Sequence, residues 1–276
     1  MNHMKIKEIF NGVTVIAFLS AFTYFGCSSG LNVYSTQDDI TLGNKIKAEI
    51  AKNPNEYPVL NDATIRSYVQ GIVNKIVSSS VIKNRVFKYE VTIIKDDKTV
   101  NAFCIPGGAM YVYTGLMKYI DDEATLAGIM GHEITHADHR HSTQQMTKQY
   151  GVETAAAILL GENSASWVQI ASNIGSNLVF LRFSRDDETD ADQNSFYALN
   201  SIPGKPWHPG AIKYFMRKTL QKTGRTSDLE KLFMTHPPSE DRLAAIEALE
   251  KKEKLAAPTE TTLNRANYQK YRAMLP

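Results

Sequence analysis

The chain has 276 residues, of which 43% are hydrophobic and 22% are charged, so it is long enough to bury one substantial core. Its formal net charge is only +2 and no basic run stands out, which argues against a nucleic-acid partner. No repeat at a solenoid period is evident, and this argues against a helical-repeat array.

The N-terminus has the layout of a bacterial secretory signal. Two lysines precede the apolar run 16–22, which stops at small residues around Cys27. A basic region, a short apolar region and a small-residue exit are the three parts of such a signal. We therefore predict a signal peptide over residues 1–26, followed by an N-terminal linker over 27–40.

Cys27 resembles the lipid-modified cysteine of bacterial lipoproteins. Gly26 suits the position before it, whereas Tyr24 stands where leucine is usual. Ser28 follows, and in such lipoproteins a residue other than aspartate there favours the outer membrane. The resemblance predicts a lipid anchor on Cys27 at the periplasmic face of the outer membrane. Cys104 would then be the only remaining thiol, so no internal disulfide could form. The alternatives are an uncleaved membrane anchor and a plain signal peptide with an incidental cysteine.

Two amphipathic stretches then predict helices. The first runs from about Leu42 to Ala51 and is closed by Pro54. In the second, apolar residues recur at i, i+3, i+4 and i+7 between Asp62 and Val77. This is the rhythm of a helix that packs one face on a core.

A small sheet is expected next. The hydrophobic period changes to two over Phe87–Ile93, which indicates a half-buried strand. Short strands follow at 100–104 and 110–113, with a Pro-Gly-Gly break at 106–108. We expect a small antiparallel sheet, along whose edge an extended peptide could pair.

The most specific chemical signal is His132-Glu133-Ile134-Thr135-His136, an H-E-x-x-H motif. On a helix, histidines four residues apart leave one face a turn apart, and two neutral imidazoles held in this way supply half of a tetrahedral zinc site. Glu133 lies on the flank of that face, where its carboxylate can take a proton from the attacking water. The alternative is an ordinary helix with surface histidines.

His139 and His141 follow the motif. His139 lies three residues beyond His136 on nearly the same face and is a rival ligand. His141 points elsewhere on the helical wheel, which indicates a role in packing or in supporting a ligand. Stretches 152–160 and 167–181 are predicted to form apolar helices, and neither reaches the ~18 uninterrupted apolar residues that a membrane span needs.

An acidic cluster after Ser184 contains a candidate third ligand. Ser184 and Asp187 have the spacing of a helix N-terminal cap pair, so a helix is expected to begin here and run to about Leu199. Glu188 can supply the third protein ligand that a site with two histidines needs. Asp192, one turn on, can accept the other N–H of a zinc histidine. The alternative is a solvated acidic helix face.

These motifs together resemble the gluzincin metallopeptidases that include HtpX, the CAAX prenyl endopeptidase and bacterial periplasmic lipoprotein proteases. The resemblance extends from about Leu42 to Lys251, and the single hydrophobic N-terminus favours the lipoprotein branch. Asp190 departs from the family's usual glutamate at a position that is not a ligand. The segments that carry the resemblance are His132-Glu133-x-x-His136, Ser184-Arg185 with Glu188-x-x-x-Asp192, Asn101-Ala102-Phe103 with Pro106-Gly107-Gly108, and Thr235-His236-Pro237-Pro238-Ser239.

The resemblance implies a mostly helical α+β domain of the zincin type over residues 41–255, with the small antiparallel sheet next to the H-E-x-x-H helix and a polar C-terminal tail over 256–276. It implies one Zn²⁺ per chain, bound by His132, His136 and Glu188. The other implied site residues are Glu133 and His236 in catalysis, Asp192 and Arg185 in support of the ligands, and Asn101, Ala102, Phe103, Gly107 and Gly108 in substrate binding.

The implied function is a zinc-dependent endopeptidase that degrades misfolded or unassembled envelope proteins, with Glu133 as general base. Its expected partners are these protein substrates and the membrane. His236 is expected to stabilise the oxyanion or to occupy the open zinc position at rest, and the alternative is packing beside Pro237. The main rival function is an envelope chaperone or assembly factor with a non-catalytic zinc site, against which an intact Glu133 argues. A zinc hydrolase of a non-peptide bond would share the same ligands.

Overall fold

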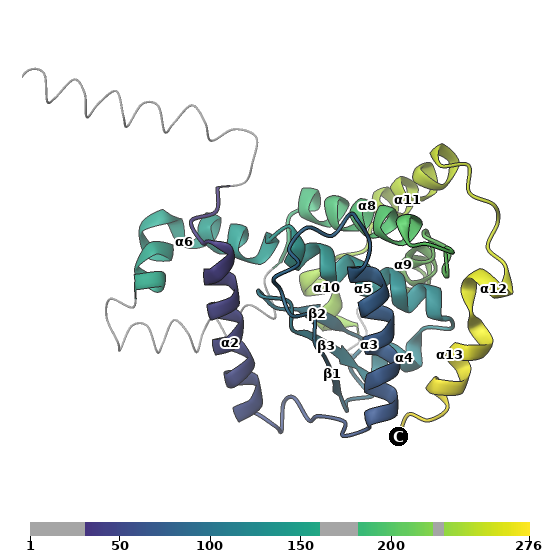
Figure 1. Cartoon of the computed structure of the whole chain (residues 1–276), viewed down its shortest axis with the longest axis horizontal. Coiled ribbons are helices and arrows are strands. Elements are labelled where there is room, and N and C mark those ends of the chain that lie inside the picture. Colours follow the sequence, from purple (N-terminus) through teal and green to yellow (C-terminus); the bar gives the residue numbers. More distant parts are fainter. Residues whose placement is uncertain (1–30, 161–181, 223–228) are drawn as a thin grey trace, which may run out of the picture.

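The computed structural model describes residues 31–160, 182–222 and 229–276 (Figure 1). Within these ranges the chain is mostly helical with one three-stranded sheet, as the sequence predicts. The predicted signal peptide, Cys27 and the helix at 167–181 lie outside the described residues. Among the helices described, none combines the length and hydropathy of a membrane span. The elements are α2 (Thr36–Lys52), α3 (Ala63–Val77), β1 (Val91–Ile94), β2 (Ala102–Cys104), β3 (Met110–Tyr113), α4 (Thr114–Tyr119), α5 (Glu123–Asp138), α6 (His141–Leu160), α8 (Arg185–Ser201), α9 (Ile212–Leu220), α10 (Glu230–Thr235), α11 (Glu240–Lys252), α12 (Glu260–Leu263) and α13 (Arg265–Arg272).

The sheet is mixed, so the prediction of a wholly antiparallel sheet was wrong. Its strand order is β1-β3-β2, in which β2 pairs antiparallel with β3 but β1 pairs parallel with it. The turn at Gly107 and Gly108, with φ values of 83° and 100°, fixes only the β2–β3 hairpin. Residues 95–101 connect β1 to β2, which lies on the opposite side of β3. Strand β3 therefore occupies the centre of the sheet and runs parallel to β1.

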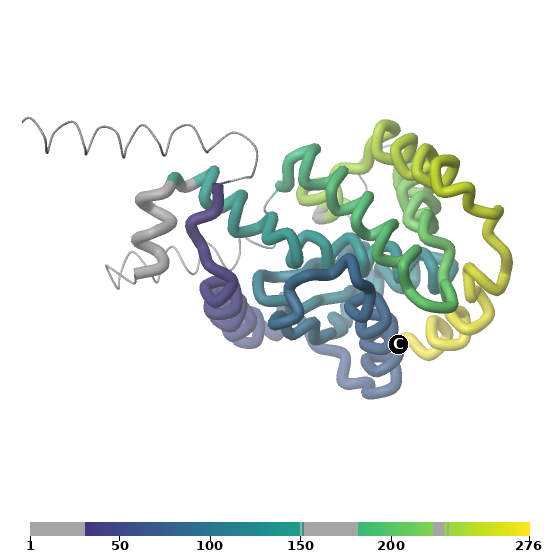
Figure 2. Tube along the Cα trace, turned by 45° about the horizontal axis from the view of Figure 1, so that its top comes forward, coloured from purple at the N-terminus to yellow at the C-terminus, as the bar shows by residue number. Residues whose placement is uncertain are grey.

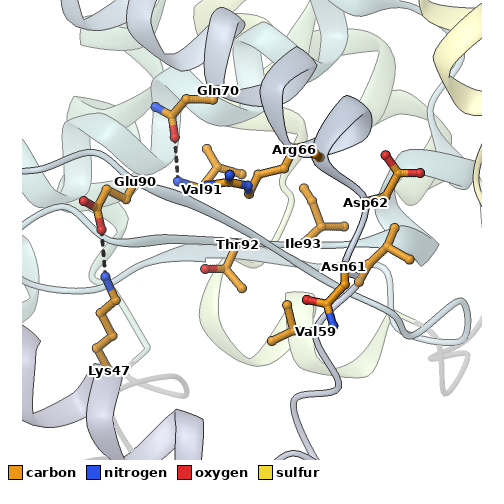
Figure 3. Close-up of a pocket in the computed structure, with 12 residues that line it drawn as sticks. Lys47, Val59, Asn61, Asp62, Arg66, Gln70, Glu90, Val91, Thr92 and Ile93 are labelled. Carbon is orange, nitrogen blue, oxygen red and sulfur yellow. Dashed lines mark hydrogen bonds and ion pairs between the residues drawn. The ribbon is translucent and has the colours of Figure 1, made fainter.

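The outer edge of β1 is covered. The Gln70 side chain of α3 accepts from the Val91 N–H and donates to the Tyr89 carbonyl, both at 2.8 Å. The Leu60 N–H donates to the Ile93 carbonyl at 2.8 Å. Figure 3 shows Gln70 reaching Val91 across a pocket of about 590 Å³ at this edge. Strand β2 is therefore the other edge of the sheet, and it packs against α5.

Helix α5, which carries the H-E-x-x-H motif, is the centre of the fold. All 16 of its residues are buried, because β2, α3, α8 and α9 pack around it. The absence of a side chain at two glycines allows this close packing. A Cβ at Gly131 would lie 2.5 Å from Ser195 Oγ of α8, and one at Gly128 would lie 3.0 Å from Ile212 of α9. The neighbouring helices can therefore bring side chains directly to the motif.

Helix α8 begins where the sequence predicts. Ser184 Oγ accepts from the Asp187 N–H at 3.1 Å, and the Asp187 carboxylate accepts from the Ser184 N–H at 3.0 Å. This reciprocal pair is a capping box and confirms the predicted cap. With the start of α8 fixed, Glu188 and Asp192 lie on its buried face, each 1% exposed.

The segment 256–276 folds against the start of α5 as α12 and α13. The Glu123 carboxylate accepts hydrogen bonds from Asn264 at 2.8 Å and Asn267 at 2.7 Å, and Tyr268 is fully buried. The polar composition of this segment does not predict these contacts. Figure 2 shows α12 and α13 at the end of the molecule opposite α2, which begins at Thr36 inside the predicted linker.

Candidate metal centre

Two elements bring three predicted ligands together. His132 and His136 leave α5 one turn apart, and their Nε2 atoms lie 3.0 Å from each other. Glu188 reaches them from α8, with its Oε2 3.6 Å from His132 Nε2 and its Oε1 3.4 Å from His136 Nε2. All three side chains are buried. The alternative of surface histidines on an ordinary helix therefore does not describe this site.

His236 completes the cluster. It follows α10, and its Nδ1 lies 2.8 Å from Glu188 Oε1 and 3.3 Å from His132 Nε2. The ligand atoms of His132, His136, Glu188 and His236 all lie within 4.8 Å of one another. His139, considered as a rival ligand, belongs to a separate group with His141 and Asp190.

The hydrogen bonds behind the histidines decide where their lone pairs point. His132 Nδ1 lies 2.8 Å from Asp192 Oδ1, and an ionised carboxylate only accepts, so Nδ1 carries the proton. His136 Nδ1 lies 2.9 Å from His141 Nδ1 and can donate to it in the same way. Both Nε2 atoms then direct lone pairs toward each other and toward Glu188. Two imidazoles with one carboxylate are a ligand set that suits zinc.

Arg242 of α11 neutralises the acidic residues behind the site. Its Nε and Nη2 donate to Asp192 Oδ2 and Oδ1 at 2.7 and 2.8 Å, and its Nη1 lies 2.6 Å from Glu188 Oε2. Arg185, predicted for this supporting role, is exposed at the start of α8, and Arg242 occupies the position in its place. The buried pair Glu188 and Asp192 requires a cation. The sequence does not show which of its 31 lysines and arginines supplies it.

Burial and neighbouring charges shift the pKa values of the cluster. Burial lowers the pKa of His136 well below its usual value, which keeps the imidazole in the neutral form that binds metals. Burial alone would raise the pKa of Glu188, but the neighbouring charge of His236 holds it well below its usual value. Glu188 is therefore an anionic ligand candidate beside a neutral imidazole.

Glu133 lies between the cluster and the sheet. Burial raises the pKa of its carboxyl, although the charges of His236 and His132 oppose this. The backbone of Cys104 in β2 also opposes the rise in the pKa of Glu133. Its Oε1 lies 3.6 Å from His236 Nε2. The structure thus places a carboxylate with an elevated pKa next to the candidate ligands and at the edge strand.

The residues predicted to bind substrate divide into two groups. Asn101, Ala102 and Phe103 lie in or next to β2, and Phe103 packs its ring on Tyr111 with centroids 4.8 Å apart. A Cβ at Gly107 would lie 3.0 Å from Ile40 Cα, and one at Gly108 would lie 3.1 Å from the Lys88 backbone. These two glycines therefore shape a turn that packs on α2 and the segment before β1. Their role in substrate binding stays a prediction.

Comparison with known proteins places these features in a family. The model of peptidase family M48 matches residues 64–250. The beta-barrel assembly-enhancing protease of Escherichia coli K12 is 28% identical over 196 residues, which are 68% of this chain and 39% of that protein. The metalloprotease YcaL of the same strain is 26% identical over 234 residues, 80% of this chain and 85% of YcaL. The mitochondrial metalloendopeptidase OMA1 of Schizosaccharomyces pombe is 29% identical over 184 residues, 65% of this chain and 51% of OMA1.

The match spans well under half of the assembly-enhancing protease and about half of OMA1. The family model nevertheless covers most of this chain, including the motif helix α5, the acidic helix α8 and the turn at His236. These similarities confirm the predicted gluzincin family, while its lipoprotein branch stays a prediction. The chain belongs to peptidase family M48.

Proposed function

We propose that the chain is a zinc-dependent endopeptidase of the cell envelope that degrades misfolded or unassembled proteins. His132, His136 and Glu188 bind one zinc ion in this proposal. The observation that carries it is the convergence of buried ligand atoms within 4.8 Å of one another, next to Glu133. Three protein ligands with a fourth position left for water are typical of catalytic rather than structural zinc.

Glu133 is the general base in this proposal. Zinc, when bound, supplies a Lewis acid that polarises the scissile carbonyl and acidifies the attacking water. Glu133 takes the proton of that water and delivers it to the leaving amine. The raised pKa of its buried carboxyl suits a group that must hold a proton and then release it.

Extended substrates pair along β2. Asn101 and Ile105 direct backbone groups to β3, so in an antiparallel ladder those of Ala102 and Cys104 point away from it, on the side of α5. Pairing through backbone groups selects for extension rather than sequence, as a protease of unfolded chains requires. An apolar wall that could receive a side chain of the substrate adjoins Glu133 and is made by Ile212, Phe215 and Met216.

His236 restrains the site at rest. Its Nδ1 lies 2.8 Å from Glu188 Oε1 and 3.3 Å from His132 Nε2, which supports a resting state in which its ring takes the place of water or substrate at the zinc ligands. Pro237 and Pro238 stiffen the turn that carries it. A closed resting state protects folded neighbours until an extended substrate arrives. Oxyanion stabilisation is the other role, and it requires His236 to leave Glu188 for the scissile carbonyl.

The place of action is the periplasmic face of the outer membrane, with a lipid anchor on Cys27. The E. coli relative is named a beta-barrel assembly-enhancing protease, so assembly of β-barrel proteins is attributed to that relative. The same name supports the rival function, an assembly factor or chaperone with a non-catalytic zinc site. A general base beside the first histidine has no use in such a site, and this favours the protease.

The test compares cells that express the parental chain with cells that express Glu133→Gln. In a strain that accumulates unassembled outer-membrane proteins, the parental chain should clear them, whereas Glu133→Gln, expressed at the same level, should leave them intact. Equal clearance by both would contradict the proposal. Improved assembly by both, without cleavage products, would favour the chaperone.

A further inference from the structure

His139, His141 and Asp190 form a second group of metal-type ligands beside the candidate centre. Their ligand atoms lie within 4.8 Å of one another. His141 Nε2 lies 3.2 Å from Asp190 Oδ2, and His139 Nδ1 contacts the same oxygen. Ligands bonded to a tetrahedral zinc ion at 2.0–2.1 Å are about 3.3 Å apart. Small side-chain movements would therefore let the three groups share one ion.

This second group is more accessible to solvent than the first. The side chains of His139 and Asp190 are 19% and 40% exposed, whereas His141 is 6% exposed. The candidate catalytic ligands His136 and Glu188 are only 1% and 2% exposed. An ion held by the second group would therefore exchange with solvent more readily than one in the catalytic centre.

We propose that His139, His141 and Asp190 bind a second divalent transition-metal ion, and that its binding lowers peptidase activity. Two imidazoles and one carboxylate select zinc and its transition-metal neighbours over Mg²⁺ and Ca²⁺, which prefer oxygen ligands. Three protein ligands at a partly exposed place leave coordination positions for water. The site is weaker and more exchangeable than the catalytic centre. Only the inhibitory part rests on the proposed peptidase function.

One hydrogen bond couples the two sites. His136 Nδ1 lies 2.9 Å from His141 Nδ1. When His136 binds an ion through Nε2, its proton lies on Nδ1 and is donated to His141 Nδ1. An ion on His141 Nε2 requires the opposite tautomer of His141, with its proton on Nδ1. Two N–H groups would then face each other, so the second ion disrupts the support of His136.

Equilibrium dialysis against Zn²⁺ tests the site. Parental protein carrying one tightly bound zinc should take up a second, to about two per chain. His139→Ala and Asp190→Asn, which change ligands on two different elements, should remain at about one. Asp186→Asn removes the same charge from an exposed position of α8 and should behave like the parent. Retention of the first zinc shows that each variant is folded.

Peptidase assays on the same samples test the coupling. Added Zn²⁺ should lower the activity of the parent and of Asp186→Asn by about fivefold or more, and that of the two ligand variants much less. Mg²⁺ should have no effect. A parent that stays at one zinc, ligand variants that bind the second ion normally, or equal inhibition in all proteins would overturn the proposal. A binding difference in a protein without peptidase activity would support the second site while contradicting the proposed function.

Discussion

The two histidines of the motif lie on one helix, yet they are supported in different ways. His132 Nδ1 lies 2.8 Å from Asp192 Oδ1, and Arg242 holds that carboxylate through two hydrogen bonds of 2.7 and 2.8 Å. His136 Nδ1 lies 2.9 Å from His141, behind which stands Asp190 with 40% exposure. One support is a buried ion pair, and the other is an imidazole that leads toward solvent.

The difference indicates which ligand is fixed and which is adjustable. Burial alone would raise the pKa of Asp192, but Arg242 and the hydrogen bond from His132 keep it below its usual value. Asp192 therefore remains an anion that orients His132 and strengthens its basicity. His136 receives its orientation from a ring that can adopt either tautomer. We expect zinc binding to depend more strongly on the support of His132 than on that of His136.

The comparison of the two supports assumes that His132, His136 and Glu188 are the zinc ligands. Glu188→Ala tests this assignment and has the largest expected effect. The variant should lose zinc and all peptidase activity, because two histidines do not make a catalytic site. Metal content after dialysis, measured by mass spectrometry, is the readout. Zinc content equal to the parent's would mean that another residue is the third ligand, with His236 the first candidate.

Asp192→Ala tests the buried support. Removal of the carboxylate frees the His132 ring and leaves Arg242 without its main partner, so zinc affinity should fall about 10–100-fold. Competition with a chelator of known affinity measures the change. The matched control is Asp186→Asn, an exposed acidic residue of the same helix, which should bind zinc like the parent. Unchanged zinc affinity in Asp192→Ala would mean that the support of His132 contributes no more to zinc binding than that of His136.

His236→Ala probes the side of His132 that faces the substrate. If His236 blocks the site at rest, its removal should raise cleavage of unfolded casein by about tenfold, the gain expected when a competent state of about 10% becomes dominant. Zinc should be retained, since three ligands remain. A fall in kcat of about 10²–10³ with zinc retained would instead identify an oxyanion donor.

His141→Leu should have the smallest effect. The substitution removes the acceptor of the His136 proton but leaves the three candidate ligands of the catalytic centre and the Asp192–Arg242 pair in place. Zinc affinity should fall by less than about tenfold, below the loss in Asp192→Ala. The same chelator competition decides the order. A loss greater than that in Asp192→Ala would reverse the comparison and make His136 the more dependent ligand.

Local patterns explain why part of the site could be predicted. The offsets in H-E-x-x-H and in Glu188-x-x-x-Asp192 place side chains on one helix face, and the Ser184–Asp187 cap fixes where α8 starts. Contacts across the fold carry no such spacing. The sequence does not distinguish Arg242 from the other lysines and arginines. The parallel pairing of β1 with β3 depends on the path of the connecting segment, which the alternation of apolar and polar residues within β1 does not predict.

The C-terminal segment also depends on contacts between residues that are distant in the sequence. Its polar residues suggest a solvated tail, but Asn264 and Asn267 find their acceptor in Glu123, far away in the sequence. A polar side chain is predictable as buried only when its partner is known. The fold class and motif geometry therefore followed from the sequence, whereas the supports of the site required the structure.

The most direct test of the central claim compares purified parental protein with Glu133→Gln. The structure places the Glu133 carboxyl beside the ligand cluster but outside the group of ligand atoms. Both proteins should hold about one zinc per chain, and only the parent should digest unfolded casein, with activity lost on chelation and restored by zinc. Cleavage of casein by Glu133→Gln at the parental rate, with the same zinc content, would contradict the role of Glu133 as general base.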